Sequence, residues 1–144
     1  MYKRGQSATE FLMTYGWAIL VVVVAIAALA YFGVLSPDQF LPEKCTLPPG
    51  LACIDHKITT SSVQLYLQNS MGYDITINSI NLTDKSGCIN SSSVDLVNGA
   101  EILYTIGCSS TSGSKFKSDI KISYVNSATN ISHSKVGNIV AKVE

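Results

Sequence analysis

Four cysteines are the residues of this 144-residue chain whose chemistry is most readily interpreted. Cysteines join in pairs as disulfides in oxidising compartments, or they bind zinc through their thiolates. Zinc sites usually contain two closely spaced Cys pairs, whereas the intervals between successive cysteines here hold seven, 34 and 19 residues. The even count, located after an apolar N-terminal segment, therefore predicts disulfides and no metal. The cysteines are Cys45, Cys53, Cys88 and Cys108.

Four cysteines allow three pairings, and the sequence alone permits all of them. We favour Cys45–Cys53 together with Cys88–Cys108, because each of these bonds closes a local loop. The first loop contains the segment "TLPPGLA", whose Pro-Gly turn brings the two ends of the loop together.

A single carboxylate, Glu10, lies at the start of the apolar segment. A carboxylate close to a bilayer is costly and requires a partner. One interpretation is an interfacial residue at a helix N-terminus, where the helix dipole and water both stabilise the negative charge. A second interpretation, which depends on the family resemblance described below, gives Glu10 a cationic partner on another copy of the chain.

The sequence gives little support for catalysis. His56 and His133 are its only histidines, and neither has the spacing of a catalytic triad or a metal site. There is no glycine-rich phosphate loop and no G-x-S-x-G motif. Net charge is zero and the only basic cluster is Lys3-Arg4, which argues against nucleic acid as a partner. We therefore expect a protein that is not an enzyme and needs no cofactor.

Three N-x-S/T sequons follow the apolar segment, at Asn81, Asn90 and Asn130. In an exported domain such asparagines are candidate acceptors for N-linked glycans. The high Ser and Thr content produces tripeptides of this kind by chance, so the motif alone does not establish glycosylation.

The element that positions Glu10 is predicted to be a membrane-length helix. Phe11 to Leu35 is a run of 25 residues without a charge. As a helix it would span roughly 37 Å, which exceeds the hydrocarbon thickness of about 30 Å. Small residues near its end allow close approach of another helix. The pair Ser36-Pro37 predicts its end, because proline disfavours a helical conformation in the preceding residue.

The remainder of the chain predicts a small β domain. Residues 38–53 contain three prolines and predict a linker, and alternating apolar residues then predict several short strands. The alternation slips by one residue between Ile77 and Ile80, which predicts a bulge or corner. The fold class is therefore α+β, a long apolar helix followed by an antiparallel β-sandwich or barrel. The predicted strands are 63–69, 74–82, 101–107, 115–125 and 138–144.

The N-terminus differs from that of an ordinary secretory leader, because its apolar run is too long and no small-residue cleavage site follows it. Lys3-Arg4-Gly5, then "QSATEF", then the uncharged helix resembles the class III signal peptide of type IV pilins, in particular archaeal ones. In that family a prepilin peptidase cuts after Gly or Ala, and the fifth mature residue is often Glu. The resemblance implies cleavage between Gly5 and Gln6, with Lys3 and Arg4 as recognition residues.

On that resemblance, Glu10 becomes the fifth mature residue and docks against the new amine of Gln6 on a neighbouring subunit. The implied divisions are a leader (1–5), a core helix (6–36), a linker (37–53) and a β-rich extracellular head (54–144). The implied partners are other copies of the chain, the prepilin peptidase, an assembly ATPase and a membrane platform protein. The precursor would lie in the cell membrane and the mature chain in an extracellular pilus, where glycans are common in the family.

Two alternatives remain open at the level of sequence. The chain could be a monomeric binding domain held by an uncleaved membrane anchor at residues 11–35. It could also be a minor pilin-like component of a secretion, uptake or adhesion system.

Overall fold

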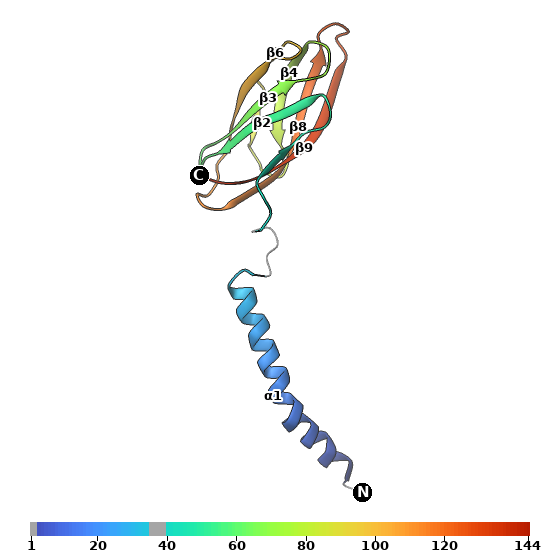
Figure 1. Cartoon of the computed structure of the whole chain (residues 1–144), viewed down its shortest axis with the longest axis vertical. Helices are drawn as coiled ribbons and strands as arrows, with labels where there is room; N and C mark the ends of the chain where they lie inside the picture. Colours follow the sequence, from blue (N-terminus) through green and yellow to red (C-terminus); the bar gives the residue numbers. More distant parts are fainter. Residues whose placement is uncertain (1–2, 35–39) are drawn as a thin grey trace. The chain divides into compact units, whose positions relative to one another are not determined.

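The computed structural model describes the backbone of residues 3–34 and 40–144, which fall into two compact units divided after Phe40. The first unit contains helix α1 (Lys3–Tyr31), drawn in blue in Figure 1. Its stretch from Gly5 to Tyr31 is long and apolar enough to cross a membrane. No apolar face of the helix is covered by the rest of the described chain, as expected for a segment that packs against lipid or other helices.

The end of α1 is set by a glycine. Gly33 has a φ of 71°, and its N–H bonds the carbonyl of Ala30 at 3.1 Å. The N–H of Val34 bonds the carbonyl of Leu29 at 3.2 Å, which completes a Schellman motif. The prediction that the helix continues to residue 36 is therefore wrong, because the left-handed glycine ends it at Tyr31 first. The expected stop at Ser36-Pro37 lies outside the described residues.

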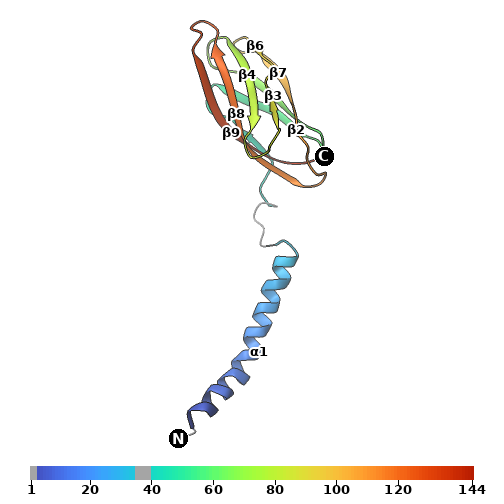
Figure 2. The same ribbon diagram turned by 180° about the vertical axis from the view of Figure 1, so that it is seen from behind.

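The second unit is an antiparallel β domain, the head, with two sheets (Figures 1 and 2). In its described residues the larger sheet has the order β1-β9-β8-β4-β5, with β6 also paired to β4, and the smaller sheet has the order β2-β3-β7. The strands are β1 (Lys44–Thr46), β2 (Leu51–Ile58), β3 (Ser62–Asn69), β4 (Ile75–Leu82), β5 (Ile89–Asn90), β6 (Val94–Leu96), β7 (Glu101–Gly107), β8 (Lys115–Asn126) and β9 (Ser132–Lys142).

A single hydrophobic core fills the space between the two sheets. In β3 and β8, every second residue points inward, and the apolar side chains among these inward residues are buried. The bulge predicted in β4 is confirmed, because the pairing with β8 shifts between Ile77 and Ser79. That shift keeps Ile77 and Ile80 on the same inner face, and both are fully buried.

The predicted linker is too long at its C-terminal end. Residues 44–46 form β1, which pairs with β9, and residues from Leu51 onward form β2. Pro48 and Pro49 lie in the turn between these strands, so their missing N–H groups remove no sheet hydrogen bond. Compact structure accordingly begins at Leu41 rather than at residue 54.

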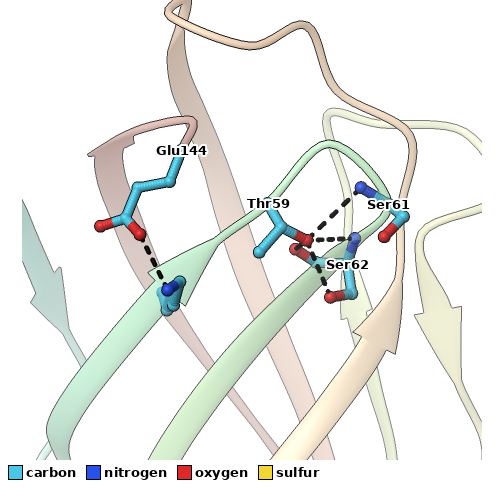
Figure 3. A network of polar contacts seen from close by, with 5 residues as sticks. Thr59, Ser61, Ser62 and Glu144 are labelled. Carbon is cyan, nitrogen blue, oxygen red and sulfur yellow. Dashed lines mark hydrogen bonds and ion pairs between the residues drawn. The ribbon is translucent and has the colours of Figure 1, made fainter.

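Polar contacts stabilise the turn from β2 to β3 and join the C-terminal residue to β2 (Figure 3). In the turn from β2 to β3, the Thr59 hydroxyl oxygen accepts hydrogen bonds from the N–H groups of Ser61 (3.4 Å) and Ser62 (3.1 Å). Lys57 Nζ lies 2.9 Å from Glu144 Oε2, and the N–H of Glu144 bonds the carbonyl of Ile58. The C-terminal segment is therefore joined to the smaller sheet.

Candidate processing and assembly sites

The proposed processing site lies within the first turns of α1. Gly5 and Gln6 are both helical and exposed, and the Gly5 carbonyl accepts a hydrogen bond from Thr9 Oγ1 at 2.8 Å. A peptidase must unwind this turn to reach the Gly5–Gln6 bond, and glycine lowers the cost because it is a poor helix former. The side chains of Lys3 and Arg4, the predicted recognition residues, lie outside the described part of the chain.

Glu10 lies one turn after the candidate cleavage point and is exposed. Its backbone carbonyl accepts a bond from Thr14 Oγ1 at 2.8 Å, while its carboxylate has no hydrogen-bond or ion-pair partner among the described residues. It is the only charged side chain between Gly5 and Tyr31. A single carboxylate at the start of an apolar helix can therefore bind a cation supplied from outside the chain.

Both favoured disulfides are present. Cys45 is joined to Cys53 with a Cα–Cα distance of 5.9 Å, and Cys88 is joined to Cys108 at 4.7 Å. His56 lies beside the first bond, with its ring nitrogen and the two sulfurs within 4.8 Å of one another. Because both sulfurs form the disulfide, they are not thiolate ligands, and this cluster does not have the chemistry of a zinc site.

The three sequon asparagines have different environments. Asn130 is exposed in the turn between β8 and β9, where its φ is 57°. Asn81 is half-buried in β4, between Lys121 of β8 and Ile89 of β5. Asn90 uses both ends of its amide: Nδ2 donates to the Thr105 carbonyl at 2.7 Å, and Oδ1 accepts from the N–H of Ser92 at 2.9 Å. Of the three sequon asparagines, only Asn130 therefore presents an exposed side-chain amide that makes no hydrogen bond to the described residues.

The two histidines lie apart in the head and have different neighbours. The imidazole of His133 stacks on the ring of Tyr124, its direct partner in the β8–β9 ladder, with centroids 5.5 Å apart. His56 lies in β2, on the other sheet. The structure therefore does not place the two histidines together as a catalytic pair.

The head carries a cluster of lysines that the sequence reveals only in part, because the alternation of residues 115–125 places Lys115, Lys117, Asp119 and Lys121 on one face of that strand. We call the outward side of β1, β9 and β8 the lysine face. Cross-strand pairing places Lys115 opposite Lys142, and it places Lys44 and Lys117 on either side of Val140. Lys121 and Asp119 complete this face. Two further carboxylates lie beside it, because Asp84 Oδ2 accepts from the N–H of Asp119 and Glu43 Oε1 accepts from the N–H of Lys142. Lys115, Lys117 and Lys121 belong to β8, and the antiparallel register brings Lys142 and Lys44 beside them. The lysine face comprises Lys44, Lys115, Lys117, Lys121 and Lys142, with Asp119 among them.

The outward side of the smaller sheet has the opposite charge. Asp55 pairs with Tyr66 across β2 and β3, and Tyr66 pairs with Leu103 across β3 and β7. Glu101 of β7 lies opposite Gln68, whose Nε2 donates to Glu101 Oε1 at 3.4 Å. The Glu101 carboxylate beside the Tyr66 hydroxyl raises the pKa of that tyrosine. We call this surface, defined by Asp55, Tyr66, Gln68, Glu101 and Leu103, the acidic face.

Comparisons with known proteins provide no family assignment. No protein-family model matches the chain, and no curated protein sequence matches it.

Proposed function

We propose that this chain is the structural subunit of an archaeal type IV pilus. In this proposal the prepilin peptidase removes residues 1–5, and the mature chain polymerises through α1 while its head forms the outer surface of the filament. An assembly ATPase and a membrane platform protein would supply the energy and the base for growth.

The observation that carries the proposal is a long apolar helix with one carboxylate at its start, joined to a separate disulfide-bonded head. Within the described chain nothing covers the helix, so it requires lipid or other helices around it. Packing against copies of itself with an axial offset gives a head-to-tail contact that does not close, and such contacts generate filaments.

Glu10 gives this assembly a defined offset. Cleavage before Gln6 would create an amine, and the amine of one subunit would pair with the Glu10 carboxylate of the next. A paired charge in an apolar environment contributes little net stability, but it is effective at fixing register. The carboxylate has no partner in the described chain, which leaves it available for this contact.

The substitution Glu10→Ala tests this role. We expect a cleaved, membrane-inserted subunit with both disulfides and few or no filaments, because the amine of the neighbouring chain loses its partner. The matched control is Thr14→Ala, one turn along, whose hydroxyl bonds only within its own helix. Filaments of wild-type number and helical symmetry from the Glu10→Ala chain would show that Glu10 is only an interfacial residue.

A further inference from the structure

Opposite charges lie on the two outer faces of the head. The lysine face has five lysines and one aspartate, and the carboxylates of Asp84 and Glu43 lie beside it, bonded to the N–H groups of Asp119 and Lys142. Among the described residues the one ion pair is Lys57–Glu144, so no lysine of this face has a carboxylate oxygen within 4.0 Å. Lys117 and Lys121 are exposed, and Asp119 lies between them on the same strand. Along β8 this face therefore presents a row of charges in the order positive, negative, positive.

The acidic face presents the complementary order. Asp55 and Glu101 provide its two carboxylates that have no cationic partner among the described residues, since the charge of Lys57 on the same sheet is paired with Glu144. Asp55 Oδ1 accepts from the N–H of His56, and Glu101 Oε1 accepts from Gln68 Nε2. Between the two carboxylates lie the uncharged side chains of Tyr66 and Gln68, whose hydroxyl and amide groups bond Glu101. The order is negative, neutral, negative, which is complementary to the two lysines of the row on β8.

The spacing of the two rows also agrees. Lys117 and Lys121 are four residues apart on one strand, so their Cα atoms are roughly 13 Å apart. Asp55 and Glu101 are separated by two strand spacings and by two residues along the strands, which gives roughly 12 Å. Facing one another, the rows would place each ammonium near a carboxylate and Asp119 over the uncharged side chains of Tyr66 and Gln68.

A depression on the smaller sheet can receive one lysine. It has a volume of about 140 Å³ and is lined by Asp55, His56, Lys57, Gln64, Tyr66 and Leu103. The charge of Lys57 is paired with Glu144, which leaves Asp55 as the unpaired charge of the wall. The exposed side chain of Leu103 and the ring of Tyr66 provide an apolar wall for the methylene chain of a lysine, and Asp55 provides a partner for its ammonium.

We infer that the lysine face of one head docks on the acidic face of the next head, with Lys117 and Lys121 opposite Asp55 and Glu101. This inference rests on the proposed filament function, because subunits in a helical filament meet through two different surfaces. The occupant is thus a second copy of this chain. Charge pairs of this kind fix which surfaces meet and in which register, more than they add affinity.

The test is a charge exchange in the full-length chain, with surface filaments counted by electron microscopy. One variant carries Lys117→Glu and Lys121→Glu, a second carries Asp55→Lys and Glu101→Lys, and a third carries all four substitutions. We expect filaments to be lost in the first two and recovered in the third. Protease resistance and intact disulfides would show that each head is folded, and Lys85→Glu, on the loop after β4, serves as the control that should still assemble.

The outcomes separate the inference from the function on which it rests. Absence of filaments from the wild-type chain would refute the pilus proposal itself. Wild-type filaments together with normal assembly of both charge-reversed variants would overturn the docking inference alone. Loss in both variants without recovery in the four-fold variant would overturn it as well. Normal assembly of the Lys117→Glu, Lys121→Glu variant, with lost binding to heparin beads, would assign the lysine face to an external polyanion instead.

Discussion

Asn69 Nδ2 donates a hydrogen bond to the carbonyl of Leu96 at 3.0 Å, and both residues are buried. The same nitrogen donates to the Tyr73 carbonyl at 2.9 Å, and Asn69 Oδ1 accepts from the N–H of Met71 at 3.0 Å. One side chain thus satisfies backbone groups in the loop after β3 and at the end of β6. It is fully buried because it continues the inward row of β3, where the preceding inward residues are apolar.

Replacing Asn69 with Ala should destabilise the head by about 2–4 kcal/mol, because each buried backbone group left unpaired costs about 1–3 kcal/mol. Urea unfolding of the full chain in detergent, followed by tyrosine circular dichroism, measures the change. The matched control is Asn138→Ala, an exposed asparagine in β9, for which we expect a change below about 0.5 kcal/mol. Equal effects of the two substitutions would refute the bridging role.

Tyr104 connects the two sheets and should make the head sensitive to alkali. Its hydroxyl lies 2.9 Å from the Ser92 carbonyl and 3.1 Å from that of Asn90, and burial raises the pKa of Tyr104. A raised pKa in the folded state means that this stabilising contribution is complete below the unfolded pKa of about 10 and is lost as the pH rises above it.

Tyr104→Phe should therefore lower stability by about 1 kcal/mol at neutral pH, through the lost hydrogen bond. The difference between wild type and variant should shrink as the pH rises past about 10. Urea midpoints measured across this range provide the test. A difference that stays constant with pH would exclude Tyr104 as a source of the alkaline sensitivity.

The two disulfides should contribute unequally. They join cysteines separated by 8 and 20 residues, and the chain-entropy relation gives roughly 2.5 and 3 kcal/mol respectively. Replacing Cys88 and Cys108 with Ser should lower the urea midpoint more than the same change at Cys45 and Cys53. The opposite order would show that the contacts of β1 with β2 and β9, rather than loop length, decide the contribution.

If the head is glycosylated, Asn130 should carry the glycan and Asn90 should not. Asn130 is exposed in a turn, whereas both ends of the Asn90 amide bond the protein. Mass spectrometry of the native protein should show that Asn130→Gln removes a glycan mass and that Asn90→Gln removes none. A glycan found on Asn90 would mean that the chain is modified before β5 and β7 come together.

The sequence predicted the elements in which alternation is regular and failed where local geometry interrupts it. The strands β3, β7 and β8 have regular rows of inward residues, and β4 has a regular stretch on each side of its bulge, so each is predicted within a few residues. In β2 only Leu51 and Ile58 are fully buried, and the pairing shifts between Cys53 and Asp55, so no period of two remains. The strand β9 begins six residues before its predicted start, because residues 132–137 are mostly exposed. The helix α1 ends where Gly33 adopts a positive φ, before the end that Ser36-Pro37 predicts. A lone glycine is a weaker sequence signal for a helix end than a Ser-Pro pair.

The candidate sites divide in the same way. The cysteine pairing follows from short loops, and the candidate processing site and Glu10 are local in sequence, so the sequence alone is enough to predict them. The lysine face and the acidic face depend on the register of strands from distant parts of the chain, such as Lys44 with Val140, and no local pattern encodes that register.

The mass of the N-terminal peptide of the chain recovered from surface filaments tests the central claim most directly. The account predicts a peptide that begins at Gln6, and it predicts that Gly5→Leu gives an uncut chain and no filaments. Surface protein that retains Met1, with no filaments from the wild-type chain, would contradict the account and leave α1 as the anchor of a monomeric domain.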